Sequence, residues 1–129
     1  MFFDGIYHVG YWTDDIDAAI KFYTSTFGAE VFKEHTGPDG KTRMAFLHIG
    51  QTDVELIQPA DQSVLGGQKG LVIHHVGYLV PDIDAAIAKL KAQGMTFQTE
   101  APTVTPTNAR IIYLDTAKTL GARMHLTQI

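Results

Sequence analysis

The chain has 129 residues, of which 45% are hydrophobic and 19% charged, and its formal net charge is −4. This composition is that of an ordinary globular protein, and the length predicts a single domain. The ten Lys and Arg residues are scattered, which argues against nucleic acid or a membrane surface as a partner. No cysteine is present, so disulfides and thiolate metal sites are excluded. Since neither a signal peptide nor a membrane span is recognisable, we expect a cytoplasmic protein.

The first elements predicted in chain order are a strand and a helix. Residues 7–13, YHVGYWT, are rich in aromatic and β-branched residues, as strands are. Asp14 or Asp15 is expected to begin the helix, and Gly28 to end it. The apolar residues between them lie at helical spacing: Ile16, Ala19, Ile20, Tyr23 and Phe27. The period then changes to two, which predicts strands over 29–35, 42–50 and 53–58.

The chain then repeats itself with an offset of 67 residues. HVGY occurs at 8–11 and again at 75–78, and DIDAAI at 15–20 and again at 82–87. Each copy predicts a strand followed by a helix, and in the second copy Asp82 is the expected N-cap and Gly94 the expected stop. Strands are predicted next over 95–100, 110–115 and 122–128, with a loop over 101–109. Such internal similarity indicates a fold built from two like units.

The sequence therefore predicts an α+β fold of two β-α-β-β-β modules. Module one covers residues 1–60, a glycine-rich linker covers 61–70, and module two covers 71–129. A module of about 65 residues is marginal alone, so we expect both to belong to one domain. The modules are expected to form a pseudo-twofold repeat with a curved, mostly antiparallel sheet around a metal site, and with the helices behind the sheet.

Four residues at equivalent places in the two modules are candidate metal ligands. His8 and His75 begin the two HVGY copies, and Glu55 and His125 lie in the last strand of each module. A single histidine or acid on a strand more often faces solvent or is simply hydrogen-bonded. Two related pairs of ligand-type residues favour a metal site instead. Three imidazoles and one carboxylate suit Zn, Mn, Fe, Co or Ni.

The other histidines are expected to have structural roles. His74 precedes His75 on one strand, so the two side chains point to opposite faces. His48 has no equivalent in the second module, and His35 lies beside a turn.

The duplicated pattern and its paired histidines resemble the vicinal oxygen chelate superfamily. This superfamily includes glyoxalase I, methylmalonyl-CoA epimerase, extradiol dioxygenases and bleomycin-binding proteins. Segments 8–31, 54–59 and 71–94 look most like the epimerase and glyoxalase branch, with the second ligand falling on Glu55 and the third on His75. Arg110 lies at a matching place in the epimerase ending. Where that ending has a metal-binding glutamate, this chain has His125, which leaves the four-ligand shell of a divalent metal one charge more positive.

The resemblance implies a metal-dependent isomerase or lyase that binds a small molecule and works as a homodimer. Such enzymes remove a proton next to a carbonyl and stabilise the resulting enediolate. Glu55 is the candidate base, because it is the only carboxylate among the four ligands. Aromatic side chains are candidates for the substrate pocket, together with Arg110: Tyr11, Trp12, Phe46 and Tyr78. The alternatives are an Fe- or Mn-dependent dioxygenase and a non-catalytic drug-binding protein of the same fold.

Overall fold

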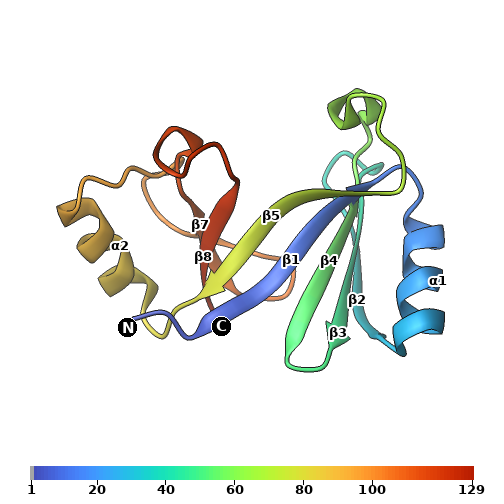
Figure 1. The fold of residues 1–129 in the computed structure, drawn as a ribbon, viewed down its shortest axis with the longest axis horizontal. Coiled ribbons are helices and arrows are strands. Elements are labelled where there is room, and N and C mark those ends of the chain that lie inside the picture. Colours follow the sequence, from blue (N-terminus) through green and yellow to red (C-terminus); the bar gives the residue numbers. More distant parts are fainter. Residues whose placement is uncertain (1) are drawn as a thin grey trace. The chain divides into compact units, whose positions relative to one another are not determined.

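The computed structural model describes residues 2–129, and it contains two helices and eight strands in the predicted order. The first module comprises β1 (Gly5–Thr13), α1 (Ile16–Phe27), β2 (Glu30–Thr36), β3 (Arg43–Ile49) and β4 (Thr52–Gln58). The second comprises β5 (Leu71–Leu79), α2 (Ile83–Ala92), β6 (Thr103–Val104), β7 (Arg110–Tyr113) and β8 (Met124–Gln128) (Figure 1). The predicted α+β fold with two β-α-β-β-β modules is confirmed. Neither helix of the described residues is long and apolar enough to cross a membrane.

The chain folds into two compact units whose boundary passes through β1 and β5. The first unit is His8–His74, and the second combines the residues up to Tyr7 with His75–Ile129. The N-terminal residues therefore pack with the second module, because Phe2 and Phe3 contact its apolar core. The segment predicted as a linker contains a short 3-10 helix, Gln62–Leu65, whose last residue is buried.

Each unit pairs its strands in the same way. In the first unit β2 pairs with β3 and β3 with β4, both antiparallel, while β1 runs parallel to β4. In the second unit β6, β7 and β8 form the antiparallel pairs, and β5 runs parallel to β8. The expectation of mostly antiparallel pairing is confirmed. The parallel pairs place the first and last strands of each module side by side, and these strands carry the four candidate ligands.

Both helices begin at the predicted aspartates. The Asp15 carboxylate accepts a hydrogen bond from the Ala18 amide at 3.1 Å, and Asp82 does the same for Ala85 at 3.0 Å. These side chains satisfy amides that the first turn leaves without a helical partner. Gly28 ends α1 in the left-handed conformation, as predicted. The cap of α2 is Gln93, one residue before the predicted stop.

One apolar core lies in each unit, on the face that its helix covers. In the first unit α1 packs against β2, β3 and β4 and buries Ile16, Ala19 and Tyr23. In the second unit α2 packs against β8 and buries Ile83, Ala86 and Ile87. The opposite face of each sheet is thereby left for other side chains, because successive residues on a strand point to opposite faces.

The prediction of a strand over 95–100 is wrong. Local hydrogen bonds occupy its two ends: the Met95 amide donates to the Leu90 carbonyl at 3.0 Å, and the Thr99 hydroxyl to the Ala101 carbonyl at 2.8 Å. Such local bonds compete with a strand ladder, and only an isolated bridge from Phe97 to Leu114 forms. The strand β6 instead lies within the predicted loop, where it pairs with β7 in a short hairpin.

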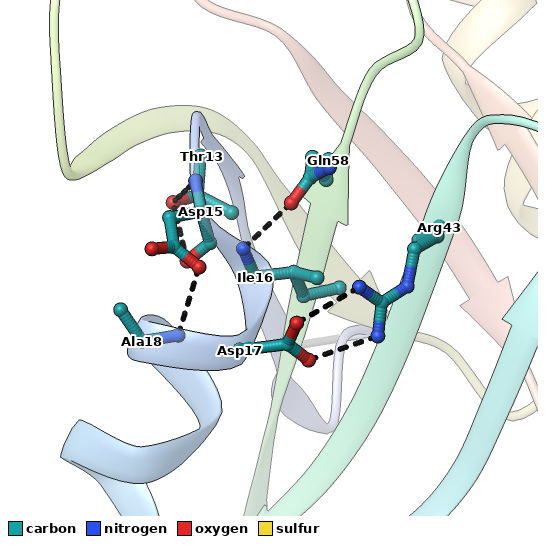
Figure 2. Close-up of polar contacts among 7 residues, drawn as sticks. All are labelled: Thr13, Asp15, Ile16, Asp17, Ala18, Arg43 and Gln58. Carbon is teal, nitrogen blue, oxygen red and sulfur yellow. Dashed lines mark hydrogen bonds and ion pairs between the residues drawn. The ribbon is translucent and has the colours of Figure 1, made fainter.

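The start of each helix is tied to its sheet by an Arg–Asp ion pair and a glutamine hydrogen bond. In the first unit the Ile16 amide donates to Gln58 Oε1 at 2.8 Å, and Arg43 binds Asp17 through both Nη atoms (Figure 2). Arg43 and Gln58 face each other across β3 and β4. We call each set of four residues a helix clamp.

The second unit repeats the helix clamp at equivalent positions. The Ile83 amide donates to Gln128 Oε1 at 2.9 Å, and Arg110 binds Asp84 at 3.1 Å. Arg110 and Gln128 are again a cross-strand pair. The sequence repeat thus preserves side chains that fix the helix on the sheet.

We predict that the glutamine contributes more to stability than the ion pair does. Replacing Gln58 with Met removes the acceptor and leaves a partly buried amide unsatisfied, which should lower the free energy of unfolding by about 1–2 kcal/mol. Arg43→Met should lower it less, because the ion pair is exposed to solvent. Urea denaturation measures both values. A larger loss for Arg43→Met would contradict the prediction.

Candidate metal centre

In the first unit, His8 and Glu55 project from the face of the sheet opposite α1. His8 lies on β1 and pairs with Asp53 of the parallel strand β4, and Gly10 pairs with Glu55. Their neighbours Tyr11, Val54 and Leu56 belong to the core on the helix face. Because side chains alternate along a strand, His8 and Glu55 share the other face.

Burial keeps the His8 imidazole neutral. Only 5% of the residue is exposed. Loss of hydration lowers the pKa of His8 to about 4, and the nearby Asp53 carboxylate opposes this change only in part. At neutral pH the ring therefore has an unprotonated nitrogen, which is the form that binds metals.

Burial has the opposite effect on the charge of Glu55. Loss of hydration disfavours the carboxylate and raises the pKa of Glu55 to about 7. Part of the apolar surroundings is Phe46, which is buried and lies opposite Glu55 on β3. A carboxyl group with such a pKa can both take and release a proton near neutral pH.

In the second unit, His75 and His125 occupy the positions equivalent to His8 and Glu55. His75 lies on β5, and His125 lies on β8 opposite Gly77. Their ring centres are 4.9 Å apart, and 2% and 1% of the two residues is exposed. The Tyr113 ring packs edge-on against both imidazoles, at 5.6 and 5.0 Å between ring centres. The two rings are thus held side by side in a closely packed environment.

The close approach of His125 to β5 requires glycine at position 77. A Cβ atom on Gly77 would lie 2.4 Å from Cε1 of the His125 ring, which is closer than atoms in contact can approach. Gly10 faces Glu55 at the same place in the first unit. In the second unit, the third letter of the HVGY repeat therefore makes room for the side chain across the parallel strand.

A buried threonine fixes the orientation of the His125 ring. Thr127 Oγ1 lies 2.8 Å from His125 Nδ1, and Thr127 is fully buried. This hydrogen bond occupies Nδ1 and sets which edge of the ring faces Thr127. A partner of this kind is typical of a metal-binding imidazole.

The candidate pocket residues lie in different places. Trp12 follows Gly10 by two residues and shares its face, and its ring centre is 4.4 Å from that of His74. Tyr11 packs on the core of the first unit. Tyr78 lines an apolar hollow of about 370 Å³ with residues that include Leu126. Hence Trp12 and Phe46 share a face with candidate ligands, whereas Tyr11 and Tyr78 lie on the helix faces and Arg110 belongs to a helix clamp.

Sequence reasoning missed several side chains beside the candidate ligands. Thr127 lies where the first module has Ile57, so the repeat could not reveal it. Tyr113 pairs with His125 as Phe46 pairs with Glu55, so the repeat could have revealed it from Phe46. A period-two reading could have found Thr127, since it follows His125 by two residues on β8. His48, which the sequence suggested to be structural, forms a 2.6 Å hydrogen bond from Nδ1 to Asp53 Oδ1 on the face that carries Glu55.

Comparison with known proteins gives a consistent family. The family model of the Glyoxalase/Bleomycin resistance protein/Dioxygenase superfamily matches residues 7–113. An ethylmalonyl-CoA/methylmalonyl-CoA epimerase of Cereibacter sphaeroides is 36% identical over 92 residues, covering 67% of this chain and 69% of the relative. A probable chloroplastic lactoylglutathione lyase of Arabidopsis thaliana is 30% identical over 93 residues, covering 67% of this chain and 25% of the relative.

The solved structures agree with this family. The crystal structure of methylmalonyl-CoA epimerase from Mycobacterium tuberculosis superposes with a TM-score of 0.87 and 26% identity, covering 98% of this chain and 89% of that protein. The fold is thus that of the vicinal oxygen chelate proteins. This chain belongs to the Glyoxalase/Bleomycin resistance protein/Dioxygenase superfamily, and its relatives include epimerases and a lyase.

We predict that Gly77→Ala displaces His125 and destabilises the protein. The new methyl group collides with a ring that is fully buried, so the free energy of unfolding should fall by about 1–3 kcal/mol or more. Gly37→Ala is the matched control, because a Cβ there makes only ordinary contacts, at 3.4 Å and beyond. Thermal and urea unfolding of both variants measure the effect. An equally small loss in the two variants would disprove the steric constraint.

We also predict that Glu55 makes the metal-free protein less stable as the pH rises from about 4.5 to 7. In this range the unfolded chain releases the Glu55 proton and the folded chain retains it, so ionisation favours unfolding. Glu55→Gln removes this effect. At pH 8 the variant should be more stable than the wild type by on the order of 1 kcal/mol, and at pH 4 the difference should vanish. Urea denaturation in chelator at the two pH values tests this, and a constant difference would refute it.

Proposed function

We propose that this protein is a metal-dependent enzyme of the epimerase and lyase type, which moves a proton on a carbon next to a carbonyl group. One observation carries the proposal. Each unit places a histidine on its first strand and a second ligand-type side chain on the adjacent parallel strand, at the same register. His8 with Glu55, and His75 with His125, are the two pairs.

The proposed ligands fit a divalent metal. Three of them are the buried histidines His8, His75 and His125, each of which offers an imidazole nitrogen. Glu55 is the proposed fourth ligand and adds an oxygen donor. Such a set suits Zn, Ni, Co, Mn or Fe. In our proposal His125 binds through Nε2, while its Nδ1–H donates to the Thr127 hydroxyl.

The bound metal would act as a Lewis acid for negative charge that develops on a carbonyl oxygen. The protein supplies the proton transfer. Glu55 is the proposed base, because it is the one carboxylate among the four proposed ligands. It takes the proton from the carbon, and the electron pair of the broken C–H bond spreads toward the carbonyl oxygen. Phe46, opposite Glu55, helps to keep water from the reacting carbon.

The relatives suggest which substrates to assay. The Cereibacter relative is named for acyl-CoA thioesters, and the Arabidopsis relative for a glutathione thioester. Both names describe a thioester of a small acid. We therefore propose a small acid carried on a thiol as the substrate class, with methylmalonyl-CoA and S-lactoylglutathione as first compounds. A homodimer in the cytoplasm remains our expectation for its biological form.

Metal content is the first test. Protein purified without chelator or affinity tag should contain close to one metal ion per chain by plasma mass spectrometry, and His8→Ala should lose it. His35→Ala is the matched control and should retain the metal, because His35 lies on β2 outside the proposed ligands. Glu55→Gln should keep the fold and much of the metal but lose turnover.

Two results would overturn the proposal. Wild-type protein that stays metal-free after incubation with these ions is not a metalloenzyme of this kind. Glu55→Gln protein that turns over a substrate as fast as the wild type removes Glu55 as the base.

A further inference from the structure

We infer that the first unit has a binding site for a small, uncharged molecule with one aromatic ring, at the start of α1. The site is a hollow of about 410 Å³, lined by residues of α1 and of the segment that leads into β5. Ala19, one of its lining residues, belongs to the core on the helix face of the sheet. His8 and Glu55 project from the other face, so this site is independent of the proposed function.

The second unit has a smaller hollow at the equivalent place, with a volume of about 120 Å³. The 67-residue offset of the repeat relates each residue that lines it to a residue that lines the larger hollow. The pairs are Phe2 with Lys69, Pro81 with Asp14, Asp82 with Asp15, Ala85 with Ala18, Ala86 with Ala19, and Lys89 with Phe22. The two hollows are therefore two copies of one surface of the fold.

In the second unit this surface carries an aromatic ring of the chain itself. Phe2 packs against the core of that unit, and its ring centre is 4.5 Å from that of Phe3. The ammonium nitrogen of Lys89 lies over the Phe2 ring, 4.5 Å from its centre, which is the geometry of a cation–π contact. The repeat thus shows which chemical group this surface accommodates, namely a benzyl ring beside a lysine.

The first unit lacks a ring at this position of the repeat. Lys69 replaces Phe2 and Gly70 replaces Phe3, and the Lys69 side chain is 83% exposed. Two large apolar residues that line the hollow are open to solvent, since Phe22 is 45% and Leu71 37% exposed. The space of the missing ring is therefore bordered by apolar surface, and its volume is within the range of sites for small ligands.

The charges around the hollow favour an uncharged ligand. The Asp14 carboxylate accepts a hydrogen bond from the Gly70 amide at 2.7 Å and lies 3.9 Å from Lys69 Nζ. The Asp15 carboxylate is bonded to the first turn of α1. These carboxylates repel a ligand carboxylate, and Lys69 repels a ligand ammonium. The Lys69 ammonium complements the negative face of an aromatic ring, as Lys89 does in the second unit.

The path of the chain favours a small molecule over a peptide. In the second unit Phe2 belongs to the segment that runs into β1, and the Asp4 amide ties this segment to the Leu79 carbonyl at 2.8 Å. In the first unit residues 69–71 take the equivalent path, and the Gly70 amide is bonded to Asp14. A peptide that followed the path of Phe2 would collide with this segment, whereas a free ring would not.

Two-dimensional proton–nitrogen NMR of the full chain, titrated with benzyl alcohol, tests the inference. Saturable shifts should appear at the amides of Ala18, Phe22 and Lys69. Benzylamine and benzoate carry the same ring with a charge, and both should bind more weakly. Cyclohexylmethanol is the matched probe without an aromatic ring. In Lys69→Met, the affinity for benzyl alcohol relative to cyclohexylmethanol should fall by about two- to fivefold, because the cation–π contact is lost.

Three variants locate the ligand. Ala18→Leu places a larger side chain in the hollow and should abolish the shift at Lys69, while its exposed position on α1 spares the core. Ala88→Leu is the matched control, because Ala88 is equally exposed on α2 and lines neither hollow, so benzyl alcohol should bind as in the wild type. Lys69→Phe reproduces the arrangement of the second unit. Its ring should occupy the hollow, raise Tm and prevent binding.

Four results would overturn the inference. Wild-type protein whose amide signals in α1 and residues 69–71 do not move with benzyl alcohol has no such site. Equal shifts in Ala18→Leu place the ligand elsewhere on the protein. Tighter binding of a charged probe, or an unchanged affinity ratio in Lys69→Met, rules out an uncharged aromatic ring as the preferred group. Signals of this region that change with protein concentration in the absence of ligand show that a second copy of the chain covers the hollow instead.

Discussion

The close contact between a glycine and the side chain opposite it on a parallel strand is the constraint on which the candidate site depends. His125 lies over Gly77 so closely that no Cβ fits between them. Two β-strands in register normally leave space for side chains at every position. Here position 77 is a glycine and has no side chain, so the His125 ring can lie across β5 and reach His75. The Thr127 hydrogen bond and the Tyr113 ring then hold it there.

Sequence periodicity and the internal repeat were sufficient to predict most of the fold. The aspartate caps are short-range features, so Asp15 and Asp82 could be identified from their neighbours alone. The conformation of segment 95–100 could not be predicted in this way, because its apolar residues alternate as they do in a strand. What decides its conformation is the bonding of its ends to Leu90 and Ala101, which depends on the path of the chain. The hairpin containing β6 was missed for the same reason.

The candidate site was predictable to the extent that it obeys the repeat. His8 and His75 are identical residues at equivalent positions, and Glu55 and His125 both occupy the last strand of a module. Residues present in only one unit could not be found in this way. His48 is an example: it pairs with Asp53 across β3 and β4, and a cross-strand register cannot be read from a single strand. Likewise, nothing in the local sequence of Arg110 indicates that its guanidinium binds Asp84.

The separation of the apolar cores has a consequence for how such a protein changes during evolution. The first core contains only residues of the first unit, and the second core only residues of the second, including Phe2 and Phe3. Each unit also has its own helix clamp. A substitution that alters packing in one core therefore leaves the packing of the other in place, and effects on independent sites add. The two halves of a duplicated chain can then diverge separately, so that one has a carboxylate at the candidate ligand position while the other has an imidazole.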